Sequence, residues 1–379
     1  MSNLNRVESQ PDVRIRKGSV VVYRVFDIGD HVDIKRAEDI LSQQIGKLRL
    51  GLNLKRRSSI VIQRPPVRFQ LGEYELKFGN STIKAEIFAT LWDYGALSIA
   101  FQIPLQNAAW SELMALSGWL QAEEEGARQI DFASKLKATE VLRLLNPAIQ
   151  KVKLWEVSED YIIYFLNEVE GIVDGADLIR KTDIPALILG EAKIALSEQS
   201  KVGIAESILQ YGKEDIIVID WNSALVLEPS GQTETLDVFE FALSHLLEVR
   251  FYDDLLDQRL SELYKAVQAK RKGIFKNLFA GLLKEANTRF IEFSELTERV
   301  DNSLKIVGDF YLATVFRGCL KEFRISDWQK SITRKMDLFA QISGLLHDEV
   351  NVQRSTVLEL VIILLIVFET ITAFLHRGA

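Results

Sequence analysis

The sequence predicts an α+β protein that ends in a single transmembrane helix, and three features carry this prediction. Up to about residue 230, short apolar strands and amphipathic helices follow one another in the order β-α-β-β-α-β. From Thr235 onward the apolar residues keep helical spacing and no proline interrupts them. The last apolar run, Val357 to Leu375, has the length of a membrane span.

The N-terminal part predicts a ferredoxin-like α+β sandwich over residues 19–170, after a disordered lead at 1–18 without a signal peptide. Its strands and helices are expected at the following places: a strand at Val20–Phe26, a helix at Ile34–Leu48, a small hairpin around Gly72, a clear hairpin at Ile83–Ile103, helices at Trp110–Leu120 and Phe132–Leu145, and a strand at Tyr161–Phe165.

Residues 171–234 predict a continuation of the α+β domain. Ile216–Ile219 and Ala224–Leu227 are two apolar runs joined by turn-forming residues, so we expect a β-hairpin at 216–227. Asp220 lies in this turn, between two apolar strands, and is the carboxylate for which we expect a raised pKa. The alternative is that Asp220 only forms the turn.

Residues 235–353 predict an antiparallel helical bundle or hairpin, with coiled-coil-like spacing. The first helix, Leu236 to Val267, is longer than thirty residues, a second spans Glu285–Ile306, and a third runs through Trp328 to Leu346.

Residues 354–377 predict a C-terminal membrane anchor. The nineteen residues from Val357 to Leu375 make a helix of about 29 Å, close to the hydrocarbon thickness of a bilayer. A buried helix of a soluble protein is the alternative, because Glu359 and Glu369 are costly in lipid. Basic residues precede the span more often than they follow it, so we expect a single pass through the cytoplasmic (inner) membrane with the body in the cytoplasm.

The two membrane carboxylates lie on one helical seam. Glu359, Ile362, Ile366 and Glu369 follow spacings of 3, 4 and 3, which is the pattern of paired helices. We therefore expect this face to contact a second copy of the chain and form a homo-oligomer. The alternative is a monomeric anchor whose two acids reach the headgroups by snorkelling.

The tail also resembles a known family. Arg354, Leu358-Glu359 and a second acid at Glu369 are similar to the C-terminal signature of the family named for "required for meiotic nuclear division", the RMD family. Leu360 stands where that family usually has an aromatic residue. The resemblance implies a membrane-anchored protein with no established enzymatic activity, whose mitochondrial members are associated with anchoring the translation machinery.

Composition and motifs exclude several classes of protein. The net charge of −7 and the pI near 5.4 argue against general nucleic-acid binding. No phosphate-binding glycine motif, nucleophile elbow or paired histidines are present, so we expect no catalytic site, cofactor or metal. Asp253, Asp254 and Asp257 could hold a divalent cation, but a solvated helix face is the simpler interpretation. The single cysteine, Cys319, is expected to be buried.

A basic segment breaks the acidic average. Lys270, Arg271, Lys272 and Lys276 precede Phe279 and two leucines on a short helical pattern with a wide apolar face. We expect it to contact an anionic surface, either lipid headgroups or a partner, and burial in the bundle is the alternative.

These features favour a tail-anchored membrane scaffold or adaptor, not an enzyme, that presents its α+β domain and helical stalk to an unidentified protein partner. The first alternative is a membrane-tethered hydrolase with its site in the α+β domain. The second is ribosome or RNA tethering, which rests on the family resemblance and the basic segments.

Overall fold

The structure is a computed structural model that describes residues 13–44, 65–121, 124–191, 196–205, 207–268, 288, 291, 294, 310–342, 359 and 362–366. The chain divides into two compact units. The first unit comprises Met1–Phe251 and Glu295–Asp327, and the second comprises Tyr252–Ser294 and Trp328–Ala379. Each unit is described by itself.

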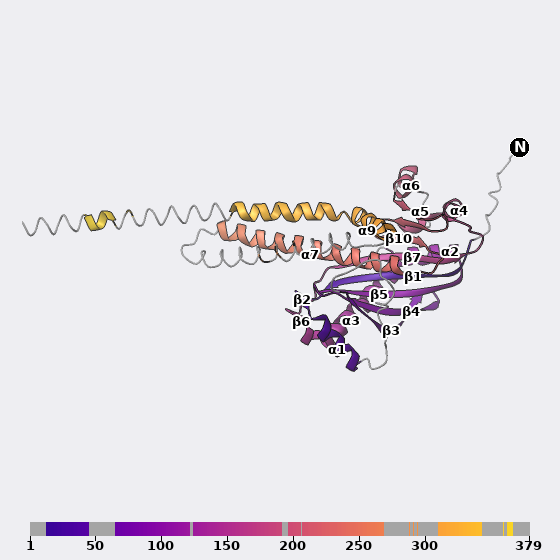
Figure 1. The fold of residues 1–379 in the computed structure, drawn as a ribbon, viewed down its shortest axis with the longest axis horizontal. Helices are drawn as coiled ribbons and strands as arrows, with labels where there is room; N and C mark the ends of the chain where they lie inside the picture. The colour runs from indigo at the N-terminus through magenta and orange to yellow at the C-terminus, as the bar shows by residue number, and fades with distance from the viewer. Residues whose placement is uncertain are drawn as a thin grey trace, which may run out of the picture. The chain divides into compact units, whose positions relative to one another are not determined.

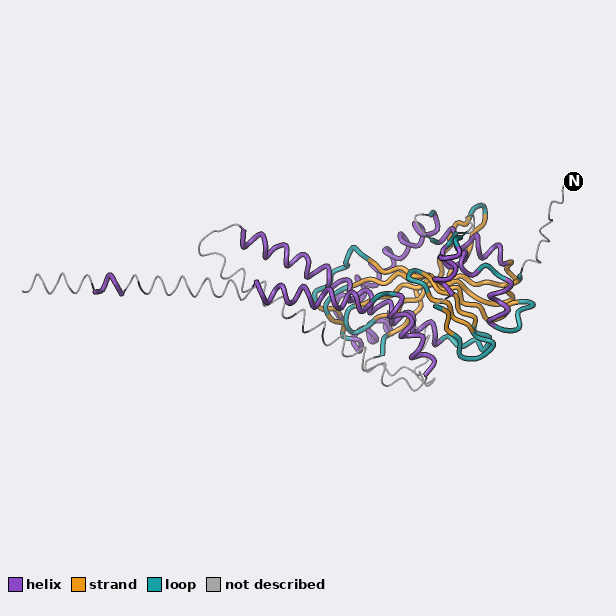
Figure 2. Tube along the Cα trace, turned by 90° about the horizontal axis from the view of Figure 1, so that it is seen from above, coloured by secondary structure: helices purple, strands orange, loops and turns teal. Residues whose placement is uncertain are grey.

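The first unit is built on an eight-stranded sheet with the order β3-β4-β5-β1-β7-β10-β9-β8 (Figure 1). Its strands are β1 (Arg14–Asp27), β3 (Val67–Phe78), β4 (Ser81–Leu91), β5 (Ala96–Ala109), β7 (Ser158–Val169), β8 (Ile208–Leu209), β9 (Ile216–Ile219) and β10 (Ser223–Leu227). All neighbours are antiparallel except β7 and β10, which are parallel. The expected α+β class is confirmed, and the sheet is mixed. Figure 2 shows the strands together in orange.

The sheet is larger than the four strands of the β-α-β-β-α-β pattern. Those four lie in the order β4-β5-β1-β7, while β3 extends the sheet on one side and β10, β9 and β8 extend it on the other. The hairpin of β9 and β10 therefore belongs to the same sheet as β1. A separate two-stranded sheet joins β2 (His31–Val32) and β6 (Ile149–Gln150).

The described helices begin and end as follows: α1 (Ile34–Gln44), α2 (Trp110–Leu120), α3 (Glu125–Leu145), the 3-10 helix η1 (Asn146–Ala148), α4 (Gly175–Lys181), α5 (Ile184–Leu189), α6 (Glu198–Ala205), α7 (Glu234–Gln268), α9 (Phe310–Glu322) and a helix at 325–342. At 35 residues, α7 confirms the expected helix of more than thirty residues. The boundary between the two units falls within α7, after Phe251.

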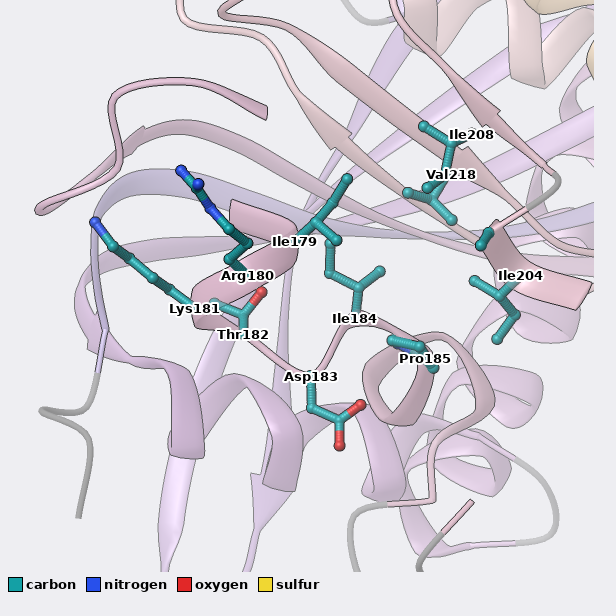
Figure 3. A pocket seen from close by; sticks show the side chains of 11 residues that line it. Ile179, Arg180, Lys181, Thr182, Asp183, Ile184, Pro185, Ile204, Ile208 and Val218 are labelled. Carbon is teal, nitrogen blue, oxygen red and sulfur yellow. The ribbon is translucent and has the colours of Figure 1, made fainter. Parts of the chain in front are cut away.

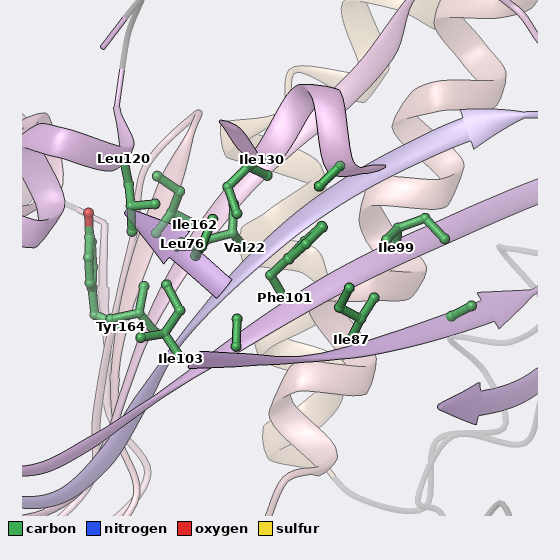
Figure 4. Packing of buried hydrophobic residues seen from close by; sticks show 14 of the residues in the cluster. Val22, Leu76, Ile87, Ile99, Phe101, Ile103, Leu120, Ile130, Ile162 and Tyr164 are labelled. Carbon is green, nitrogen blue, oxygen red and sulfur yellow. The ribbon is translucent and has the colours of Figure 1, made fainter. Parts of the chain in front are cut away.

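One face of the sheet packs on α2 and α3, and we call it the α2–α3 face. Because side chains alternate along a strand, Val22, Phe101 and Ile162 point to the same side, and they join Leu120 and Ile130 in one buried cluster (Figure 4). Every strand from β4 to β9 in the sheet order contributes aliphatic residues to this cluster. Burial of apolar surface at about 25 cal/mol per Å² makes this layer a major source of stability.

The opposite face, which we call the α7–α9 face, packs on α9 and the first half of α7. Tyr161 of β7 stacks on Phe239 of α7 at 5.7 Å and meets Phe323, just after α9, edge-on at 5.2 Å. Val21 and Val25 of β1, which alternate with the other face, are also buried. Apolar residues on both faces are typical of strands covered on both sides, so the central strands read as nearly continuous apolar runs.

Two expectations need correction. The lead predicted for 1–18 is too long, because β1 begins at Arg14 and Ile15 is fully buried against neighbouring strands. The hairpin predicted around Gly72 is wrong, because β3 continues through it as one strand. The pairing with β4 shifts by one residue between Gln70 and Gly72, and Gly72 has a φ of 100°, so the glycine accommodates a β-bulge and not a turn.

The hairpin predicted around Asp93-Tyr94-Gly95 is confirmed by the antiparallel pairing of β4 with β5. Gly95 has a φ of 102°, and a Cβ there would overlap the carbonyl oxygen of Gly29. The same Gly95 accepts a hydrogen bond from the Ile28 backbone N–H at 2.9 Å. Only glycine satisfies both the backbone conformation and the close approach.

The second unit contains α7 from Tyr252 onward and the helix 325–342 from Trp328 onward. Lys335 joins the two: its Nζ lies 2.8 Å from Asp253 Oδ1 and 2.6 Å from Asp257 Oδ2, and it donates to the Asp253 carbonyl at 3.0 Å. The expected second helix, Glu285–Ile306, lies outside the described residues except for Thr288, Ile291 and Ser294.

Among the described residues, none of the helices has the length and apolar character needed to cross a membrane. Of the span expected at Val357–Leu375, only Glu359 and residues 362–366 are described, and they are helical.

Candidate functional site

A cavity of about 470 Å³ lies in the first unit, between α4, α5, α6, the edge strand β8 and its neighbour β9. Its lining is mostly aliphatic: Ile179, Ile184, Pro185, Ile204, Ile208 and Val218. Figure 3 shows Ile179 and Ile184 in the middle of the site, with Ile204, Ile208 and Val218 together on one side. A site of this kind binds an apolar group more readily than a polar one.

The polar groups of the cavity come from the end of α4 and the turn before α5. Arg180 and Lys181 extend away from Ile204 and Ile208 in Figure 3, and both pair with Asp177, at 2.7 and 3.0 Å. Hydrogen bonds from Lys181 and Arg180 hold the pKa of Asp177 below its usual range. Asp183 accepts a hydrogen bond from the Ala186 N–H and caps α5. These charges stabilise the local fold and leave the cavity floor apolar.

The carboxylates with raised pKa values lie elsewhere. Burial raises the pKa of Glu159 in β7 to about 7, although Arg250 of α7, 2.7 Å away, lowers it. Burial also raises the pKa of Asp220, as expected, and Tyr161 Oη donates to the Asp220 carbonyl at 2.8 Å. Neither carboxylate lines the cavity. The cavity therefore lacks the converging pair of carboxylates that acid–base hydrolysis needs.

A second group of polar residues lies on the α7–α9 face, some of them fully buried and others reaching the surface. Arg68 of β3 pairs with Asp237 at 3.1 Å and with Glu240 at 3.8 Å. The Tyr23 hydroxyl and Glu240 Oε1 are buried and have no hydrogen-bond partner among the described residues. The same holds for both ring nitrogens of His245, and burial lowers the pKa of that histidine to about 4. The sequence does not single out these groups, because a polar residue within a strand or helix pattern carries no local signal of burial.

In the part of the chain that the structure describes, the acidic residues of α7 do not form a group of three or more potential metal ligands. The cation between Asp253 and Asp257 is the Lys335 ammonium. Asp254 instead accepts a hydrogen bond from Gln258 at 2.8 Å. The solvated-face interpretation is also wrong for Asp253, which is buried.

The remaining predicted residues are only partly described. Cys319 is a buried free cysteine, as expected, and burial raises its pKa. Glu359, Ile362 and Ile366 are helical and exposed. Outside the described residues lie Glu369 and the basic segment Lys270, Arg271, Lys272 and Lys276.

Comparison with known proteins gives one family and no established activity. The chain is 26% identical over 235 residues, 61% of its own length and 71% of the relative's, to the uncharacterized protein MJ0711 of Methanocaldococcus jannaschii. No solved structure matches the chain significantly. The expected membership of the RMD family is not confirmed by these matches. A family model described as the N-terminal domain of uncharacterized protein MJ0711 matches residues 17–234, more than half of the chain, so this protein belongs to that family.

Proposed function

We propose that the protein is a tail-anchored adaptor of the cytoplasmic membrane, with a single C-terminal span and its body in the cytoplasm. One observation carries the proposal: residues 362–366 are helical, and their five consecutive aliphatic side chains are each 50–61% exposed. A helix that is apolar all round is stable in lipid or deep inside other helices. Here the described residues do not cover it, and the flanking sequence continues the apolar run to membrane length.

The adaptor is favoured over the membrane-tethered hydrolase by the chemistry of the cavity. Its interior is aliphatic, and its two basic side chains are engaged with Asp177. Such a site suits an apolar anchor residue of a partner better than a reacting, charged substrate. Of the carboxylates with raised pKa values, Glu159 is buried beside Arg250 of α7 and Asp220 lies in the β9–β10 turn, so neither lies in the cavity.

Deletion of Arg354 to Ala379 tests the anchor. The full chain is expected in the membrane fraction after carbonate extraction, whereas the truncated chain is expected in the supernatant with the circular dichroism of a folded protein. Leu364→Arg combined with Leu365→Arg is a smaller version of the same test, because each arginine costs about 2.5–3.5 kcal/mol at the centre of a span. A full chain that carbonate extracts completely would remove the anchor from the proposal.

We extend the proposal to a homo-oligomer in which Glu359, Ile362, Ile366 and Glu369 form the contact between two anchors. Interhelical hydrogen bonds of the acids would contribute roughly 0.6–2 kcal/mol each. Cysteines at Ile362 and Ile366 should crosslink in membranes and a cysteine at Leu364 should not. Equal crosslinking from all three positions, or an oligomer unchanged by Glu359→Leu with Glu369→Leu, would contradict this seam.

The basic segment Lys270, Arg271, Lys272 and Lys276 is proposed to strengthen attachment to an anionic surface, at about 1 kcal/mol per basic residue near anionic lipid. Replacing the four residues with Gln should lower vesicle binding of the full chain at low salt. Affinity purification of the full chain from detergent extracts identifies the partner class: a stoichiometric protein supports the adaptor, and ribosomal RNA would favour tethering of the translation machinery instead.

A further inference from the structure

The outward face of α3 carries exposed apolar and basic side chains in one row. Phe132 is 69% exposed and Leu136 is 47% exposed, and Arg128, Lys135 and Arg143 are exposed beside them. Positions 128, 132, 135, 136, 139 and 143 follow spacings of 4, 3, 1, 3 and 4, so they share one side of the helix. We call these six residues, which include Thr139, the α3 stripe.

The stripe is exposed because the opposite side of α3 supplies the packing. Ile130, Ala133, Val141 and Leu145 are buried against the sheet on the α2–α3 face. A helix of a globular protein needs only one apolar side, so a phenylalanine on the outer side adds nothing to this core. Phe132 and Leu136, one turn apart, form a small exposed apolar patch between basic side chains.

The charge of the stripe is positive although the whole chain is acidic. Its six positions include three basic residues and no acid, and exposed Glu125 lies one turn before Arg128 on the same side, which leaves a net charge of +2 (three basic residues minus one acid) along this side of α3. Of the neighbouring acids, Asp131 is paired with Arg24 at 2.6 Å and Glu140 with Lys137 at 2.9 Å. Glu125 accepts a hydrogen bond from Gln129 at 3.3 Å, and Glu124 lies at the N-terminal end of the helix. The local charge therefore complements an anionic surface.

We propose that the α3 stripe is a second membrane contact, which lies on anionic lipid headgroups with Phe132 and Leu136 inserted at the level of the acyl chains. Aromatic and leucine side chains between lysines and arginines are the composition of an interfacial helix. The long basic side chains reach the phosphates while their methylene groups stay on the apolar surface. The inference rests on the proposed function, because the C-terminal span would hold the body near a bilayer.

Lipid is favoured over nucleic acid by two features. The stripe offers one aromatic ring, and single-stranded nucleic acid is bound by successive rings on which bases stack. The net charge of −7 also opposes a polyanion that covers more of the surface than one helix. A bilayer needs only the stripe itself.

A fluorescent probe on the stripe tests this with the full chain. Cys319 is the only cysteine and is fully buried, so a cysteine introduced at Thr139 takes an environment-sensitive dye selectively, with Val173→Cys, 79% exposed and outside α3, as the reference position. We expect a blue shift at position 139 with phosphatidylserine vesicles, no shift with phosphatidylcholine vesicles, and no shift at position 173 with either.

Charge variants sharpen the test. Arg128→Gln with Lys135→Gln and Arg143→Gln should raise the lipid concentration for half-maximal shift roughly 100-fold, at about tenfold or less per basic residue. Lys17→Gln with Lys153→Gln and Lys213→Gln removes the same charge from exposed positions elsewhere. This triple variant should keep the lipid concentration for half-maximal shift within twofold of the native value. Phe132→Ser should abolish the blue shift while leaving the helical circular dichroism unchanged.

Flotation after carbonate treatment distinguishes the proposed C-terminal anchor from the proposed lipid contact of the α3 stripe. Carbonate-resistant flotation without a shift at position 139 overturns the stripe and leaves the anchor. A charge-dependent shift without carbonate-resistant flotation supports the stripe and overturns the anchor. An equal effect of both charge triples, or a shift produced by RNA and not by anionic vesicles, also overturns the stripe as a lipid contact.

Discussion

The two faces of the central sheet differ in the hydrogen bonding of their buried serine hydroxyl groups. On the α2–α3 face, Ser117 is fully buried and satisfied: its hydroxyl donates to the Leu187 carbonyl at 2.8 Å and accepts from Tyr164 at 2.6 Å. On the α7–α9 face, the equally buried Ser98 hydroxyl has no hydrogen-bond partner among the described residues, and neither do the ring nitrogens of His245. On the first face the buried hydroxyl of Ser117 is paired, although the buried indole nitrogens of Trp110 and Trp119 in α2 have no partner among the described residues, whereas on the second face hydroxyl, carboxylate and imidazole atoms lie unpartnered beside the apolar packing.

This difference between the two faces follows the limits of the part of the chain that the family model matches. The match to the MJ0711 N-terminal domain ends at residue 234, where α7 begins, so it includes the sheet and α2 and α3 but not the helices of the α7–α9 face. The α2–α3 face is therefore built within the family domain, and the α7–α9 face depends on the segment that follows it. Buried ionisable groups make the stability of the second face sensitive to pH, which leads to the following predictions.

The largest effect is expected from Phe101→Ala on the α2–α3 face. Phe101 is fully buried in the apolar cluster of the α2–α3 face, and removal of a core phenylalanine costs about 3–5 kcal/mol. Urea unfolding of the full chain in non-ionic detergent should show this loss equally at pH 5 and pH 8, because the side chains around Phe101 are aliphatic or aromatic, with Tyr74 edge-on at 6.1 Å. A loss that changes with pH would mean that the two faces are energetically coupled.

Glu159 should make the stability fall as pH rises. Its pKa is raised from 4.5 to about 7 in the folded protein, so the folded state binds a proton that the unfolded state has released between about pH 4.5 and 7. The stabilisation present below pH 4.5 is lost through this window, by about 3 kcal/mol at 1.36 kcal/mol per unit. Glu159→Gln should therefore gain about that much relative to the native chain on going from pH 4 to pH 8. A difference in unfolding free energy between the two proteins that stays constant from pH 4 to pH 8 would show that Glu159 is solvated in the folded protein and not buried.

His245 should have the opposite effect in nearly the same window. Its pKa is lowered from 6.5 to about 4, so protonation of the unfolded chain destabilises the fold as pH falls from about 6.5 to 4, again by about 3 kcal/mol. His245→Phe should remove this loss at acid pH. In the native chain the opposite pH dependences of unfolding free energy from His245 and Glu159 offset each other, so each single variant should show the pH dependence of the remaining group. The double variant should have an unfolding free energy that does not change with pH in this window, if the two sites act independently.

The two buried serines provide the smallest and most closely matched comparison. Ser117→Ala should destabilise by about 1–3 kcal/mol, because it leaves the Leu187 carbonyl and the Tyr164 hydroxyl short of a partner. Ser98→Ala should be neutral or stabilising by up to about 1 kcal/mol, because it removes a buried hydroxyl without a partner. Thermal unfolding of both variants checks the pair, and equal losses would show that Ser98 has a partner in solution, such as water.

The spacing of apolar residues along the sequence was enough to predict many of the strands and helices of this fold. Strict alternation predicted the β4–β5 hairpin, because every second residue faces the α2–α3 core. Apolar residues at helical spacing and the absence of proline predicted α7, and the runs around Asp220 predicted the β9–β10 hairpin. These are properties of neighbouring residues, so a single sequence contains them.

Only the tertiary structure decided which neighbours those elements have. Sequence spacing indicates that α3 has faces, but Phe132 is outside and Ile130 is inside because the sheet lies on one side only. The Asp253–Asp257 pair is a cation site in sequence, and the cation is Lys335, about eighty residues away along the chain. Burial, pKa shifts and ion pairs depend on contacts between residues that are distant in sequence, and no local pattern encodes them. The alternation along a strand thus determined which residues share a side of it, and only the fold determined which other residues those side chains contact.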